Sequence, residues 1–257
     1  MPYGFERYTA NSGKLVISDN FLNVSLISKQ SISNFSEVSD AATISRLFPA
    51  LGDKGKIYQF TFTVGASLTN WLVAHSLSQN KIAVLEVIKS SATALNVKVY
   101  VTNDSNLSSS LIYVFASGAT SGKNYGRQIF NALTGVCCFD SNLKYMRVIG
   151  THEQKNNAVT TVPAGKTLAM LPCAYNIESA SIEDSASPSP NPNSYVITII
   201  STSTKALFNT CVGTTVTTLE LSSSSTSGGN ELASRLPRTA IKSLSSPFNL
   251  IIDVTNY

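Results

Sequence analysis

Residues 125–149, YGRQIFNALTGVCCFDSNLKYMRVI, read as a β-hairpin followed by a third strand. The two hairpin strands are residues 127–132 and 136–139, and Gly135 supplies the positive φ that a hairpin turn usually requires. A short polar break follows, and residues 145–149 then resume the strand pattern. We therefore expect this stretch to form a hairpin that leads into a sheet.

The N-terminus repeats this stretch at a constant offset of 122 residues (125 − 3 = 122). The matches are Tyr3-Gly4 with Tyr125-Gly126, Tyr8 with Phe130, Ala10 with Ala132, Gly13 with Gly135, Asn20 with Asn142, and Leu26-Ile27 with Val148-Ile149. A repeat without gaps over about 25 residues indicates a duplication. We therefore predict two hairpin-led domains, residues 1–120 and 121–257.

Short strands separated by polar loops follow each hairpin. Residues 57–64 are the clearest, because aromatic and apolar residues alternate there with Gln and Thr. A second apolar face consists of Leu95, Val97, Val99 and Val101. Further strands are expected at residues 21–27, 71–74, 82–88, 111–116, 158–162, 167–171, 195–200, 206–212, 215–221 and 248–254. This spacing favours an antiparallel sandwich or barrel, and we expect an all-β fold of two antiparallel β-sandwich-like units with few short helices.

The remaining segments read as loops or short helical turns. Helical turns are expected at residues 40–49 and 231–236, where a Pro ends each pattern, and residues 118–124 are the expected linker. Alternating Pro residues in 179–194 favour an extended, exposed loop. The low-complexity segment 222–230, SSSSTSGGN, is expected to be flexible.

Composition limits the classes of function. Hydrophobic residues make up 43% of the chain and charged residues 13%, which allows a packed core and leaves a polar, weakly charged surface. The 19 basic and 15 acidic residues are scattered, so the concentrated basic footprint of nucleic-acid binding is missing. We expect no nucleic-acid partner. The N-terminal MPYGFERYT has no signal-peptide pattern and no apolar run could span a bilayer, so we also expect no membrane insertion.

The cysteines and histidines do not form a recognisable motif. Cys137, Cys138, Cys173 and Cys211 have no CxxC spacing, so we expect reduced, mostly buried thiols, with only one of the adjacent pair deeply buried. His75 follows an apolar strand and is expected to be a hydrogen-bonded, partly buried imidazole. His152 lies in the polar stretch THEQKNN, which reads as a loop without a second metal ligand.

No pattern indicates catalysis. Nucleophile-elbow, phosphate-loop and dinucleotide motifs are all missing. Carboxylates that could act in glycoside hydrolysis are Glu86, Asp104, Asp140, Glu178, Glu183, Asp184 and Asp253, and nothing in the sequence marks a pair among them. We expect no enzyme activity, no catalytic or metal-ligating residues and no cofactor.

The hairpin carries a family resemblance. Tyr125-Gly126, Phe130, Gly135, Phe139-Asp140-Ser141 and Arg147-Val148 resemble the hairpin of small β-rich virion proteins of tailed bacteriophages, of the tail-tip or tail-fibre kind. The C-terminal residues 253–257 are of a kind seen closing such proteins, whereas the first hairpin has Ile17-Ser18-Asp19 in place of Phe-Asp-Ser. The resemblance covers about a fifth of the chain and implies location in a virion after synthesis in the cytoplasm of a bacterial host.

Low charge, many edge strands and the missing site chemistry favour a structural subunit. We expect a tail-tip, baseplate or fibre-attachment protein that assembles with other virion proteins and with copies of itself. Two alternatives remain open: a host receptor- or glycan-binding module with possible contact to the host surface, and a capsid decoration protein. Recognition would then lie in the loops at residues 104–110, 179–194 and 222–230.

Overall fold

A computed structural model shows a chain built from β-strands. It describes residues 23–38, 54–131, 133–153, 155–173, 208–219 and 248–257, and the backbone alone of residues 6–8, 15–18, 177–185, 198–207 and 220–229. Every strand pairing within this part of the chain is antiparallel, and its only helical elements are two 3-10 turns, η1 (Ile32–Asn34) and η2 (Leu107–Ser109). The all-β prediction is confirmed. The helical turns expected at residues 40–49 and 231–236 lie outside the described residues.

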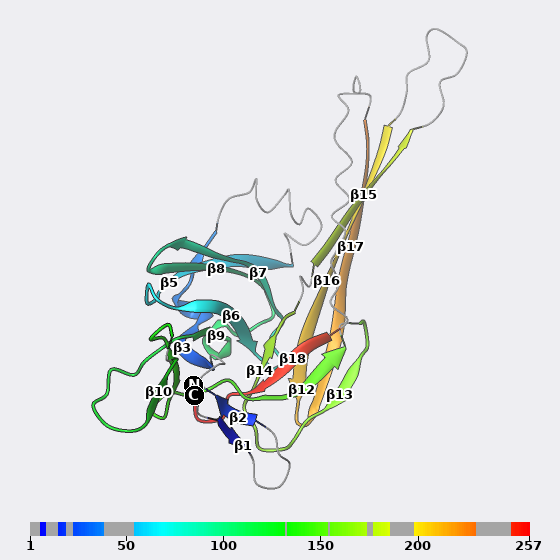
Figure 1. Ribbon diagram of the computed structural model, residues 1–257. Helices are drawn as coiled ribbons and strands as arrows, with labels where there is room; N and C mark the ends of the chain where they lie inside the picture. The colour runs from blue at the N-terminus through cyan, green and yellow to red at the C-terminus, as the bar shows by residue number, and fades with distance from the viewer. Residues whose placement is uncertain are drawn as a thin grey trace, which may run out of the picture.

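The strands follow one another along both halves of the chain (Figure 1). The first half contains β1 (Glu6–Tyr8), β2 (Leu15–Ser18), β3 (Val24–Ser31), β4 (Ser36–Glu37), β5 (Gly55–Thr63), β6 (Thr69–Ser76), β7 (Ile82–Ser91), β8 (Ala94–Thr102) and β9 (Leu111–Ser117). The second half contains β10 (Gln128–Phe130), β11 (Cys137–Asp140), β12 (Val148–Glu153), β13 (Val159–Thr161), β14 (Leu168–Leu171), β15 (Ile177–Ser185), β16 (Thr198–Val212), β17 (Thr215–Gly229) and β18 (Phe248–Asp253).

A central sheet takes three strands from each half, in the order β12-β18-β14-β6-β9-β3. Its two outer strands also meet, because Ser25 of β3 forms a bridge with Tyr145, just before β12. The Leu26 N–H donates to the Lys144 carbonyl over 2.7 Å, and the Met146 N–H donates to the Val24 carbonyl over 2.9 Å. These bonds close the sheet on itself, so neither β3 nor the start of β12 is left as an open edge here.

Apolar residues pack inside and outside this closed sheet. Alternate residues of β9 point to opposite faces, with Tyr113 and Phe115 in the inner cluster and Ile112 and Val114 in an outer one. The inner cluster also holds residues of β6, β14 and β18. The outer cluster packs against the second sheet of the first half, β4-β5-β8-β7, through the predicted face Leu95, Val97, Val99 and Val101, all of them buried.

A smaller outer cluster covers the second half. There β14 and β18 face the sheet β13-β17-β16-β15, with Met170, Ile251 and Val216 all fully buried. Phe208 of β16 reaches the first half and packs with Ile57 and Tyr100 on the outer side of the β5–β8 sheet. The two sandwich-like halves are therefore joined both through the central sheet and through Phe208.

The internal repeat extends to the register of the strands. Adding 122 to each residue of the β1–β2 pairing gives the β10–β11 pairing, with the register shift before Tyr8 matched by the shift before Phe130. The register of the β3–β9 pairing also corresponds to that of the β12–β18 pairing. Each pairing contains one register shift, between Leu26 and Ser28 in β3 and between Val148 and Gly150 in β12. Such agreement in strand pairing shows that both halves are built from one hairpin-led unit.

The two units are related by an internal two-fold axis. The strands β6 and β14 hold equivalent positions, beside β9 and β18 respectively, and they pair antiparallel with each other. On the other side of the closed sheet, Val24 meets Met146, the residue 122 positions later. Antiparallel contact between equivalent segments is the geometry of an isologous dimer interface. The division proposed at residues 120 and 121 therefore separates two halves that share one sheet.

Three predictions for the second half are wrong where the structure describes the chain, because each placed a loop or turn within a strand. Residues 195–200 and 206–212 were expected as separate strands, but β16 runs unbroken from Thr198 to Val212. The segment expected to be flexible, 222–230, belongs to β17 as far as Gly229, and the first part of the loop expected at 179–194 is β15. Ser and Thr tolerate strands, and the ladder that starts at the turn between β16 and β17 continues through them. Residues 186–194 lie outside the described part.

Candidate functional site

His75 is buried within the central sheet, more deeply than expected. Its side chain has no exposed surface, and Nδ1 lies 3.2 Å from the Ser76 carbonyl, while Nε2 has no hydrogen-bond partner. Burial lowers the pKa of His75 to about 4, which keeps the ring neutral at physiological pH. A neutral ring enclosed by apolar residues has no access to a substrate, so we assign His75 a structural role.

His152 lies in β12 and not in a loop, which corrects the prediction. It pairs with Asn249 of β18, and its side chain is fully buried between the hydroxyls of Thr160, at 2.8 Å, and Thr218, at 2.7 Å. Thr218 donates to the Asn209 side-chain oxygen at 2.9 Å, so we place the ring proton on Nε2. Burial lowers the pKa of His152. The polar neighbours of His152 explain why this strand does not look apolar in sequence.

The carboxylates are kept apart by separate cationic partners. Glu86 pairs with Lys98 at 2.6 Å and Asp104 pairs with Lys81 at 2.7 Å. Asp253 is buried and pairs with Lys166 at 3.0 Å and Arg147 at 3.5 Å. The backbone of Glu178, Glu183 and Asp184 lies in β15. Glu86, Asp104 and Asp253 therefore each have a cationic partner that neither of the other two shares.

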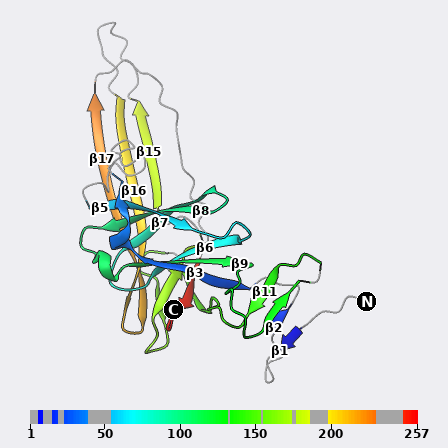
Figure 2. The ribbon, with the colours of Figure 1, turned by 90° about the vertical axis from the view of Figure 1, so that its left-hand side faces the viewer.

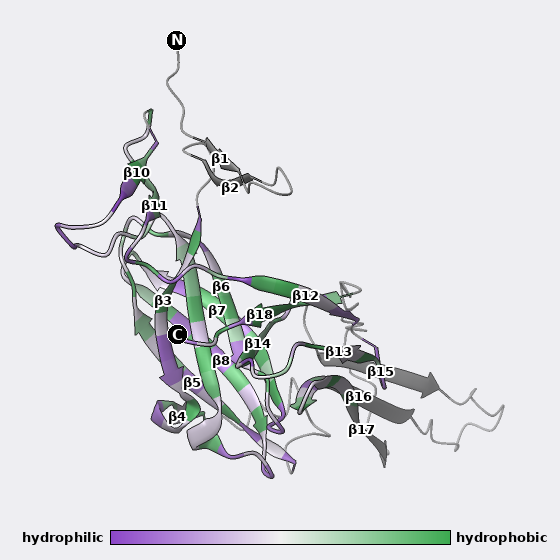
Figure 3. Ribbon diagram, turned by 90° about the horizontal axis from the view of Figure 1, so that it is seen from below, coloured by the Kyte–Doolittle hydropathy of each residue, from purple (hydrophilic) through white to green (hydrophobic). Residues whose placement is uncertain are grey.

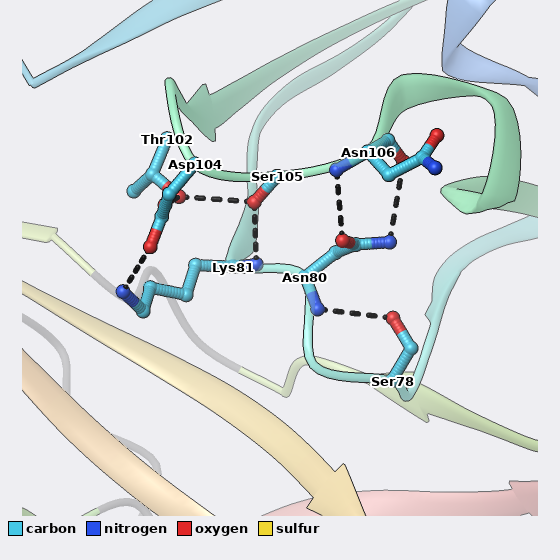
Figure 4. Close-up of polar contacts among 7 residues, drawn as sticks. All are labelled: Ser78, Asn80, Lys81, Thr102, Asp104, Ser105 and Asn106. Atoms are coloured by element: carbon cyan, nitrogen blue, oxygen red, sulfur yellow. Dashed lines mark hydrogen bonds and ion pairs between the residues drawn. The ribbon is translucent and has the colours of Figure 1, made fainter.

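Polar loop residues near one end of the first half bind one another (Figure 4). The Asn80 side chain accepts from the Asn106 N–H at 2.9 Å and donates to the Asn106 carbonyl at 3.2 Å, as a strand neighbour would. Ser105 Oγ accepts from the Lys81 N–H at 2.9 Å. These bonds tie the β6–β7 loop to the β8–β9 loop.

Asp140 anchors the base of the second hairpin. It is fully buried, and its carboxylate accepts hydrogen bonds from Ser121 N–H (2.8 Å), Ser121 Oγ (2.7 Å), Gln128 Nε2 (2.8 Å) and Asn142 N–H (2.9 Å). Burial alone would raise its pKa, but the bonds from Ser121, Asn142 and Gln128 outweigh burial and hold the pKa well below its usual range. The expected linker, residues 118–124, is thus fastened to the hairpin.

Replacing Asp140 by Asn should weaken this anchor. An amide offers one acceptor and two donors in place of the carboxylate oxygens, so buried donors lose their partner, and we expect a loss of about 2 kcal/mol in the free energy of unfolding. Urea titration at neutral pH measures the loss. Asp104→Asn is the control, because its ion pair is solvent-exposed and should cost under about 1 kcal/mol. Equal effects of the two variants would contradict the anchor.

All four cysteines are free, but their burial differs from the prediction. Cys137 and Cys138 are both buried, and Asn23 donates twice to the Cys138 carbonyl, at 3.2 and 2.8 Å. Cys173 is exposed and Cys211 is half-buried. Within the described residues, no group of three His, Cys, Asp or Glu side chains could hold a metal ion.

Two shallow hollows lie on the described surface. One, of about 370 Å³, lies beside β4 and β5 and includes Glu37, Gln59 and Phe60. The other, of about 270 Å³, lies between β6, β7 and the end of β14 and includes Trp71 and Leu171. Each contains one carboxylate and no histidine, so neither offers a pair of groups for acid–base chemistry.

The second hairpin carries an exposed apolar surface that sequence reasoning missed. Tyr125 is 67% exposed, Phe130 47% and Leu133 96%, and we call these three residues the hairpin surface. The hairpin stands apart from the main sheets, on the same side of the central sheet as β1 and β2 (Figures 2 and 3). An apolar Leu in the turn between Asn131 and Gly135 was the signal available in the sequence, because turns normally take polar residues.

Comparison with known proteins adds no relative. No protein-family model, no curated protein and no solved structure matches the chain. In the described part of the chain, no helix has the length and apolar character needed to cross a membrane. The exposed apolar residues of the hairpin surface make it the candidate functional site.

Proposed function

We propose that the chain is a structural virion protein of a tailed bacteriophage, a tail-tip, baseplate or fibre-attachment subunit that acts by protein–protein assembly. The hairpin surface carries this proposal, because exposed aromatic and large aliphatic residues on a projecting element are typical of protein interfaces. The resemblance of Tyr125-Gly126 and Phe139-Asp140-Ser141 to tail-protein hairpins supports the virion setting.

Side-chain contacts fix the base of the hairpin, while its apolar residues stay exposed. Tyr145 stacks on Phe139 with ring centroids 5.2 Å apart, and its hydroxyl bonds to the backbone of Asp140. Asp140 in turn fixes the linker. A surface ordered before binding loses little entropy when a partner docks, which favours stable assembly over transient contact.

Leu133→Asp tests the proposal. The side chain is almost fully exposed, so the variant should fold normally, while its incorporation into particles should fall about tenfold or more because a buried charge is costly. The measurement is the amount of variant protein in purified particles that were produced without the wild-type protein. Val159→Asp is the control, since Val159 is 64% exposed on β13, away from the hairpin.

Two results would count against assembly through this surface. One is normal incorporation of Leu133→Asp. The other is adsorption of the isolated chain to host cells that Leu133→Asp abolishes while incorporation stays normal, which would identify the receptor-binding alternative instead.

A further inference from the structure

The strands β15, β16 and β17 form an arm that projects beyond the rest of the molecule (Figures 1 and 2). In the first unit the equivalent hairpin, β7–β8, has strands of 10 and 9 residues, whereas β16 and β17 have 15 each. The pairing of β16 with β17 continues without a register shift from Val212 and Thr215 to Thr198 and Gly229. The second unit has therefore gained an outer arm that the first unit lacks.

One edge of the arm has a row of backbone groups that no other described strand pairs with. The Thr218 N–H donates to the Ala158 carbonyl and its carbonyl accepts from the Asn157 N–H, both over 3.0 Å, so Thr218 turns both groups away from β16. In a regular strand every second residue does the same. The next such positions are Glu220, Ser222, Ser224, Thr226 and Gly228. Among the residues that the structure describes, no strand pairs with β17 on this side beyond Thr218.

The two edges of the arm differ in charge. The outer strand on the other side, β15, carries Glu178, Glu183 and Asp184 in nine residues, and it has no basic residue. The last nine residues of β17, LSSSSTSGG, carry no charge. Charged residues protect an edge strand against pairing, and like charges on facing strands repel each other. Beyond Glu220, the β17 edge therefore lacks this protection.

We infer that the outer edge of β17, residues 222–228, pairs antiparallel with the same edge of a second copy of this chain. The pairing is isologous, so the two arms form one continuous six-stranded sheet and the charged β15 edges lie at its two ends. Backbone groups that point away from β16 in one copy then find partners in the other. This inference rests on the proposed function only in that both involve assembly, since it uses the arm and not the hairpin.

Ser224→Pro tests the edge directly. Proline removes the outward N–H of residue 224 and leaves the ladder to β16 intact, because that ladder uses the residues on either side. We expect the wild-type chain to scatter light with twice the chain mass of 27.4 kDa. For Ser224→Pro the dissociation constant of the dimer should rise about tenfold or more.

Ser181→Pro is the matched control. Ser181 lies opposite Thr202, which faces Ser225 on its other side, so its N–H points to the outer edge of β15. The same substitution there should leave the dimer intact. A monomeric wild-type chain, or equal loss of the dimer in both variants, would overturn the inference.

Hydrogen exchange gives a second readout that does not depend on a variant folding. The outward amides of residues 222, 224 and 226 should be protected in the wild-type chain, and this protection should disappear on dilution. Protection that is independent of concentration would mean that another segment of the same chain covers the edge, which contradicts the inference. A dimer that dissociates on Ser224→Pro while the Leu133→Asp variant still enters particles would contradict the proposed use of the hairpin and leave this inference standing.

Discussion

Replacing Ile252 by Ala should lower the free energy of unfolding by about 2–5 kcal/mol, the range for truncating a fully buried Ile. Ile252 has no exposed surface and lies in the cluster inside the closed sheet. Its strand, β18, pairs with β12 on one side and β14 on the other. Because β14 in turn pairs with β6 of the first unit, a cavity at Ile252 loosens the packing of both halves.

Urea titration followed by tryptophan fluorescence measures this loss, since the single Trp, Trp71, lies in β6 of the other unit. Val148→Ala is the control, because Val148 faces Ile252 in the register of β12 and β18 but is 47% exposed. It should cost under about 1 kcal/mol. Two separate unfolding transitions, with Trp71 reporting only the one that Ile252→Ala leaves unchanged, would show that the halves fold independently.

The hairpins could be predicted from sequence because their signals are local. Gly135 has the expected positive φ of 67°, and the strands on either side match the predicted ones to within two residues. The gapless repeat also indicated that the two hairpins have the same register, because identical spacing between turn and strands fixes which residues face each other. The alternating apolar residues of β5 and β8 identified their buried faces for the same reason.

Contacts between distant segments could not be predicted. Two such contacts are the pairing of β6 with β14 and the bridge between Ser25 and Tyr145. They depend on how the two units pack together, and the residue pattern of a strand does not identify its partner strand. The same limit applies to His152, whose burial depends on hydroxyls 8 and 66 residues away in sequence. The arm was missed because Ser-rich segments read as flexible until a paired strand orders them.

Stability should fall as the pH is lowered from about 6.5 to about 4, because His75 is buried as a neutral ring. Its pKa in the folded state is about 4, below the value of 6.5 for a free histidine. In this window the unfolded chain binds a proton and the folded chain does not, so the proton favours unfolding. A shift of this size corresponds to about 3 kcal/mol by pH 4. The lowered pKa of His152 adds a loss in the same direction.

The His75→Leu variant separates this effect from the carboxylates. Leucine suits the site, because the strand neighbours Ile112 and Met170 are fully buried and Nε2 of His75 has no partner to lose. Urea midpoints between pH 4 and pH 6.5 should therefore vary less in the variant than in the wild-type chain. Below about pH 4 both should lose stability together, because the pKa of Asp253, which its hydrogen bonds to Thr255 and Lys166 lower to about 2 against the effect of burial, lies below the usual 3.8. An unchanged slope between pH 4 and 6.5 would mean that His75 is protonated in the folded chain, and that water reaches Nε2.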